Sequence, residues 1–126
     1  VTIADVVLPM IYPSHYQRSV YGAGSPHAVP DHMVREALRD GIRRSARLGH
    51  PKTAEIRPYL QAFTLGPPRY TPHHVREQIR AAEELGITSW VLWNPGSRYD
   101  PGIFRSAADA DRVVADLASR RNGAPR

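Results

Sequence analysis

The chain has 126 residues, of which 41% are hydrophobic, a formal net charge of +5, and no cysteine. This apolar content suffices for a packed core. The lack of cysteine excludes disulfides, thiolate nucleophiles and cysteine-ligated zinc, and it is compatible with either a reducing or an oxidising compartment. No run of about 18 apolar residues and no apolar leader is present, so we expect no membrane span.

Three short apolar segments, each ending in aromatic and amide or imidazole residues, recur along the chain. They are residues 6–16, VVLPMIYPSHY, residues 56–63, IRPYLQAF, and residues 89–94, SWVLWN. Each is too short and too rich in Val, Ile and aromatic residues for a surface helix, and each precedes a polar loop and a segment of helical periodicity. We predict three buried parallel strands.

The first helix is predicted to begin near Asp31, an N-cap after Pro30, and to end near residues 49–51. Its apolar stripe has helical spacing and comprises Val34, Ala37, Leu38, Gly41 and Ile42. The long loop over residues 13–30 fits a lid over the strand ends and equally an ordinary surface excursion.

The second helix is predicted to begin at Thr71, with Pro72 at its first position, and to end at Gly86. Its stripe is Val75, Ile79, Ala82 and Leu85. A third helix is predicted after Ser106, whose spacing to Asp109 resembles a capping box, and residues from 120 onward are expected to fray. The inward face of this third helix would carry Ala110, Val113, Val114 and Leu117.

This order predicts an α/β fold of three βα units with parallel strands. Such units form an eight-stranded barrel or an open doubly wound sheet, and three strands alone would leave two bare edges. Because the first residue already lies next to a strand, we expect a cut or processed N-terminus and a larger assembly or covering partner chain. No glycine-rich phosphate loop follows any predicted strand, which argues against nucleotide binding.

Ligands of parallel α/β folds bind beyond the carboxyl ends of the strands. Aromatic rings offer apolar faces and amides offer paired donors and acceptors, so the strand ends predict a sugar-binding surface. The candidate substrate-binding residues are Tyr12, His15, Tyr16, Gln61, Trp93, Asn94 and Tyr99. For His15 a structural hydrogen-bonding role weighs equally, and for Trp90 we expect core packing.

Glycoside hydrolysis normally needs two carboxyl groups beside the scissile bond. Asp100 alone follows a predicted strand end, and its position before Pro101 favours a turn role. We therefore predict no acid–base pair here, and the catalytic residues are unassigned. His73 and His74 are adjacent and cannot share a helix face as metal ligands do, so no metal or cofactor is expected.

At these residues the chain resembles the C-terminal portion of a glycoside hydrolase domain family, formerly a domain of unknown function, of TIM-barrel type. The matching words are PMIYPSHY at residues 9–16, RPYLQAF at 57–63, VREQI at 75–79 and LWNPGSRY at 92–99. The resemblance implies that residues 1–126 form the last three βα units of a TIM (β/α)8 barrel. Catalytic carboxylates would then lie in a preceding N-terminal half.

Two positions depart from the family pattern. Tyr59 stands where relatives are expected to have Trp, which conserves an aromatic ring, and Ala62 stands where relatives often have Asp, which removes a carboxylate. The family's hydrolase label rests on fold, and fold does not establish function. The resemblance is compatible with a cell-envelope or extracytoplasmic location.

Three functions remain open from the sequence. The first is the substrate-binding part of a carbohydrate-active barrel enzyme, inactive as this chain alone, whose ligand is an oligosaccharide or polysaccharide. The second is a non-catalytic carbohydrate-binding or cell-envelope module. The third, less favoured, is a basic protein that binds an anionic polymer through arginine clusters at residues 43–47 and 120–126; because no aromatic residues interleave with these clusters, we expect no nucleic-acid partner.

Overall fold

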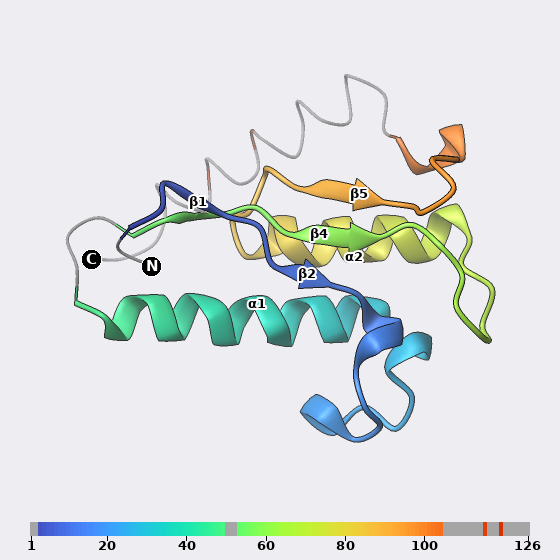
Figure 1. Ribbon diagram of the computed structural model, residues 1–126, viewed down its shortest axis with the longest axis horizontal. Coiled ribbons are helices and arrows are strands. Elements are labelled where there is room, and N and C mark those ends of the chain that lie inside the picture. The colour runs from blue at the N-terminus through green and yellow to red at the C-terminus, as the bar shows by residue number, and fades with distance from the viewer. Residues whose placement is uncertain (1–2, 50–52, 105–114, 116–118, 120–126) are drawn as a thin grey trace.

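Three extended segments lie side by side and run in the same direction in the computed structural model, which describes residues 3–49, 53–104, 115 and 119. The first contains β1 (Val6–Val7) and β2 (Met10–Ile11), the second β3 (Glu55–Ile56) and β4 (Tyr59–Gln61), and the third β5 (Val91–Trp93). β1 pairs with β3, and the larger sheet has the order β2-β4-β5 (Figure 1). The predicted parallel arrangement is confirmed.

Prolines divide the first two segments into short strands. Pro9 lies between β1 and β2, and Pro58 lies between β3 and β4, and neither has an N–H group to donate. Hydrogen bonds between the two segments nevertheless continue past both prolines, since Arg57 N donates to Val7 O and Tyr59 N to Pro9 O, each at 2.9 Å. Each pair of short strands therefore acts as one extended segment.

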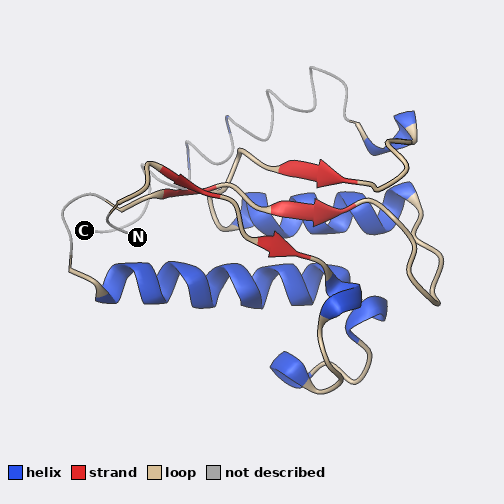
Figure 2. Cartoon of the chain, in the orientation of Figure 1, coloured by secondary structure: helices blue, strands red, loops and turns tan. Residues whose placement is uncertain are grey.

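Two helices, α1 (Pro30–Arg47) and α2 (Pro72–Glu84), cover the same face of the sheet and run back against the strand direction (Figures 1 and 2). α2 begins as predicted, with Thr71 at the N-cap, and Gly86 follows it with a left-handed φ of 82°. The predicted N-cap of α1 is wrong. Val29 is the N-cap, and Asp31 lies in the first turn, because the fixed φ of Pro30 suits the first helical position.

The core lies between the sheet and the two helices. Its buried members are Ile11, Val34, Leu38, Leu60, Val75, Ile79, Ala81, Ala82 and Ile103. Trp90 packs against this cluster, which confirms its predicted structural role. Ile42 departs from the predicted stripe, since it is 37% exposed and borders an open hollow of about 500 Å³ beside Leu85 and Ile87.

The opposite face of the sheet carries large apolar side chains that no described element covers. Met10 is 71% exposed and Trp93 is 45% exposed. Parallel sheets normally bury both faces.

The predicted third helix, with Ser106, Asp109, Ala110, Val113, Val114 and Leu117, lies outside the described residues, as does the tail from residue 120. The described helices include none long and apolar enough to cross a bilayer.

Candidate functional site

The carboxyl ends of the three segments meet at one edge of the sheet. Tyr12 follows β2, Gln61 ends β4, and Asn94 follows β5; Gln61 and Trp93 are register partners on neighbouring strands. The polypeptide around these ends, residues 12–15, 61–63 and 93–99, is called the rim below. The geometry therefore brings together six of the seven predicted site residues, namely Tyr12, His15, Gln61, Trp93, Asn94 and Tyr99.

Three rings form a cluster at the ends of the first two segments. The ring centroid of Tyr12 lies 5.4 Å from that of His15 and 5.7 Å from that of Phe63, and all three pairs meet edge to face. Tyr12 is 9% exposed, and burial, followed by the proximity of Tyr59 and Tyr99, raises its pKa, so its hydroxyl stays protonated at neutral pH. Phe63 was not among the predicted site residues, although its spacing of two from Gln61 places it on the same strand face.

Gln61 is fully buried and bonds to the backbone of two segments. Its Oε1 accepts a hydrogen bond from Ser14 N at 3.0 Å, and its Nε2 donates to Phe63 O at 2.9 Å. The expectation that a buried amide must find partners is met within the protein. Gln61 therefore ties the first rim segment to the second, and a ligand would meet the surface that Gln61 shapes.

Gln78 of α2 supports the same position and was missed by the sequence analysis. Its side chain is fully buried, with Oε1 accepting from Gln61 N at 3.0 Å and Nε2 donating to Gln61 O at 2.9 Å. These bonds satisfy the backbone of β4 where the strand ends. The available signal was a polar residue on the buried stripe of α2, three residues after Val75 and four before Ala82.

The third rim segment is a tight turn stabilised by Asn94. The Asn94 Nδ2 donates to Ala62 O at 2.6 Å and its Oδ1 accepts from Gly96 N at 2.8 Å, so both amide atoms hold backbone. Trp93 and Tyr99 remain 45% and 39% exposed. The Trp93 ring meets Tyr59 edge to face at 6.3 Å, and the Tyr99 hydroxyl donates to Leu92 O at 3.3 Å.

Tyr16 lies apart from the rim. It packs against the core cluster, with its ring centroid 6.2 Å from that of Tyr21, and lines an apolar groove of about 380 Å³ between the first segment and α1. The short 3-10 helix Pro13–His15 separates Tyr12 from Tyr16 and carries the chain around to the side of the helices. Burial, followed by Tyr21, raises the pKa of Tyr16.

The loops that follow β2, β4 and β5, called the rim loops below, hold one carboxylate, and it has a structural role. In residues 12–29, 62–71 and 94–104 the only Asp or Glu is Asp100, whose Oδ1 accepts from Gly102 N at 2.8 Å and caps the 3-10 helix Pro101–Ile103. The predicted turn role of Asp100 is confirmed.

His73 is exposed and pairs with Glu77 at 3.2 Å. Within the described ranges, no three His, Cys, Asp or Glu side chains are grouped as a metal site.

Comparison with known proteins identifies a family. The model of the family described as "Putative glycosyl hydrolase domain" matches residues 1–99. No match is found among curated proteins. Among solved structures, bee venom hyaluronidase is similar with a TM-score of 0.42 and 19% sequence identity, over 91% of this chain and 33% of that one. The chain thus spans about a third of the length of that hyaluronidase.

Proposed function

The chain belongs to the family described as a putative glycosyl hydrolase domain, and on this premise we propose that it is the C-terminal portion of a TIM-barrel glycoside hydrolase whose rim binds carbohydrate. In this proposal residues 1–126 contribute the last three βα units. The catalytic carboxylates come from the preceding part of the barrel, since the described rim loops offer no free carboxylate. The rim positions the sugar, and this chain alone does not hydrolyse it.

The barrel proposal is supported by the order of the strands and by the face of the sheet that the helices cover. The three segments are neighbours in chain order, and α1 and α2 cover one face (Figure 2). In a doubly wound sheet, helices are divided between both faces, whereas in a barrel all helices lie outside. The exposed face with Met10 and Trp93 would then be the barrel interior, with Trp93 near its carboxyl-end mouth.

The observation that carries the carbohydrate proposal is the pair of half-exposed, fixed rings beside the strand ends. Trp93 is held edge-on by Tyr59, and Tyr99 by its hydrogen bond to Leu92 O. A sugar ring has apolar C–H faces that pack on aromatic planes and hydroxyls that need polar partners. Rings that are fixed before binding lose little conformational entropy when a ligand arrives.

Calorimetric titration with an oligosaccharide panel tests this proposal. Trp93→Ala should weaken binding of the best oligosaccharide about tenfold, because it removes an apolar plane from the site. Tyr21→Ala is the control, since it removes a ring that is 37% exposed on the α1 side, away from the rim. Absence of binding by the unmodified chain, or equal affinities of the Trp93→Ala and unmodified chains, would contradict the proposal.

A non-catalytic carbohydrate-binding module is the second candidate, and it is favoured by the lack of a free carboxylate in the described rim loops. The two candidates differ in the rest of the barrel. An enzyme requires two strand-end carboxyl groups about 5–5.5 Å apart for retention or about 6.5–9.5 Å apart for inversion. Measurement of that separation in a structure that includes the preceding strands decides between them.

A further inference from the structure

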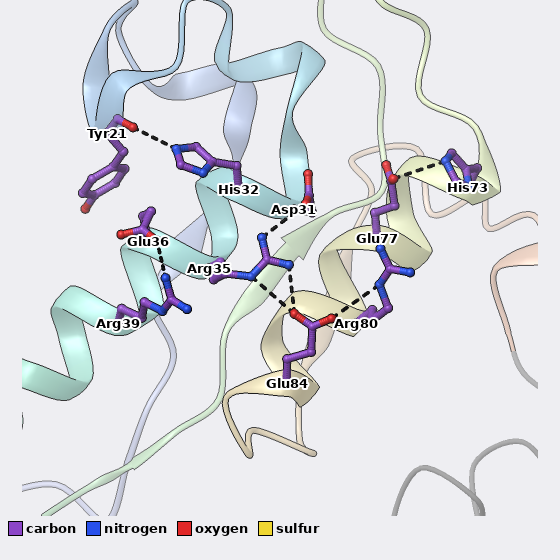
Figure 3. A network of polar contacts seen from close by, with 10 residues as sticks. All are labelled: Tyr21, Asp31, His32, Arg35, Glu36, Arg39, His73, Glu77, Arg80 and Glu84. Carbon is purple, nitrogen blue, oxygen red and sulfur yellow. Dashed lines mark hydrogen bonds and ion pairs between the residues drawn. The ribbon is translucent and has the colours of Figure 1, made fainter. Parts of the chain in front are cut away.

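The helical layer neutralises most of its arginines internally. Arg35 of α1 forms ion pairs with Glu84 of α2 at 2.9 Å and with Asp31 at 3.2 Å (Figure 3). Glu84 also forms an ion pair with Arg80 at 3.7 Å. The other arginine–carboxylate pairs in the described residues are Arg39–Glu36, Arg44–Asp40 and Arg57–Glu55, with distances of 2.8, 2.9 and 3.0 Å. Four of the seven arginines of α1 and α2 thus have a carboxylate partner, and Arg76 instead donates to Gly102 O.

The loops at the carboxyl ends of the strands show the opposite pattern. Each contributes one exposed arginine, Arg18 after β2, Arg69 after β4 and Arg98 after β5, and none of the three has a carboxylate partner among the described residues. Asp100 is engaged with Gly102 N. In the described part of the chain, the loops after β2, β4 and β5 therefore carry arginines that no carboxylate neutralises.

Arg98 has the best-defined surroundings of the three. On one side of it, Ser97 N donates to Asn94 O at 3.0 Å within the Asn94 turn, and Ser97 has a left-handed φ of 51°. On the other side, Tyr99 is tied to Leu92 O. Arg98 thus follows a hydrogen-bonded turn and precedes an exposed aromatic ring, five residues from Trp93.

Two other arginines without a carboxylate partner among the described residues have a structural explanation that Arg98 lacks. Arg43 and Arg47 are exposed near the C-terminus of α1, where a cation interacts favourably with the partial negative charge of the helix end. Arg98 lies in a turn that is not at the C-terminus of any described helix. A guanidinium group left free in such a position is suited to a planar carboxylate or a sulfate, which it binds through two parallel hydrogen bonds.

We propose that the ligand of the rim is an acidic oligosaccharide, whose carboxylate or sulfate group binds Arg98 while its rings pack on Trp93 and Tyr99. This inference rests on the proposed carbohydrate function and narrows its substrate class. Arg69, in the loop after β4, adds positive charge at this end of the sheet and attracts an anionic chain. The binding is accordingly sensitive to salt, unlike that of a neutral sugar.

The test compares matched ligands on the full chain. Oligogalacturonate supplies carboxylates, its carboxyl-reduced form supplies the same linkages without charge, and a sulfated galactan oligosaccharide supplies sulfates. At least one acidic ligand should bind ten times more tightly than its neutral counterpart. Arg98→Gln should lower that affinity about tenfold and leave the neutral affinity unchanged. Arg43→Gln is the control, because it removes the same charge from the far end of α1.

Each outcome decides the proposal. If neutral and acidic members bind alike through Trp93, the acidic-ligand inference fails and the carbohydrate function stands. If no oligosaccharide binds, both fail. A single-stranded oligonucleotide of equal charge that binds as tightly as the best acidic sugar would assign the rim to nucleic acid and overturn the inference. Equal losses in Arg98→Gln and Arg43→Gln would attribute the effect to net charge and also overturn it.

Discussion

Two buried glutamines organise the candidate site. Gln61 uses its side chain to hold the first and second rim segments, and Gln78 uses its side chain to bond the Gln61 backbone. Buried amide groups are costly unless each donor and acceptor is satisfied, and here the strand end supplies the missing partners. The rim thus depends on a residue of α2 that contacts no candidate ligand surface itself.

This role predicts a large loss of stability in Gln78→Met, which keeps the side-chain volume but removes the hydrogen bonds. The buried N–H and C=O of Gln61 would lose these partners, at an expected cost of about 3 kcal/mol in the free energy of unfolding. Urea denaturation measures it. Gln17→Met, at an exposed position, serves as the control and should stay within about 0.5 kcal/mol of the unmodified chain. A similarly small change in Gln78→Met would contradict the assignment.

At the scale of elements, α1 and α2 are joined by apolar packing and by one polar bridge. Val34 and Leu38 of α1 and Ile79 of α2 belong to the shared core, and Arg35 connects the helices at its edge through Glu84 (Figure 3). The Arg35 side chain is 21% exposed, so its ion pairs are only partly screened by solvent.

Arg35→Gln is therefore expected to lower the free energy of unfolding by about 1 kcal/mol, a value at the upper end for pairs near the surface. Arg39→Gln is the matched control, since its pair with Glu36 lies within one helix and should contribute about 0.3 kcal/mol. The difference between the variants should shrink in 0.5 M salt, as measured by urea denaturation. If salt does not change the difference in the free energy of unfolding between the two variants, the effect comes from lost packing and the ion-pair account is contradicted.

The sequence predicted the kind and order of the described elements because their apolar periodicities are clear. The stripe of α2 and its Thr71 and Gly86 boundaries match the structure. The effects of proline were harder to predict. Pro9 and Pro58 divide two predicted strands into shorter ones, although the hydrogen bonds between these segments continue past both residues. Pro30, and not the residue after Asp31, is the first residue of α1. These details depend on which N–H groups face a neighbour, and periodicity carries no such information.

The site was predicted less completely than the fold. Strand ends located the rim, but Tyr16 lies on the α1 side because a single 3-10 turn redirects the chain after Tyr12. Gln61 and Asn94 were expected to face ligand, and their amides instead bond backbone across segments. Sequence reasoning identified residues that require partners. Which partners they find depends on tertiary contacts such as that of Gln78, 17 residues away.

At the scale of the whole molecule, the described chain is a three-segment parallel sheet with one covered face, one exposed apolar face and one basic, aromatic edge. The face covered by α1 and α2 contains the buried apolar core that stabilises the fold. The exposed face fits the interior of the larger barrel proposed for the family. The edge holds the exposed rings of Trp93 and Tyr99 together with Arg98, and it is where the proposed ligand would bind.

Amide chemical-shift mapping during titration of the full chain with its best-binding oligosaccharide tests this account most directly. The account predicts that the shifted resonances belong to residues 12–15, 61–63 and 93–99, with those around Trp93 and Arg98 changing most. Shifts confined to the outer faces of α1 and α2 or to the apolar groove beside Tyr16, or no shifts with any oligosaccharide, would contradict it.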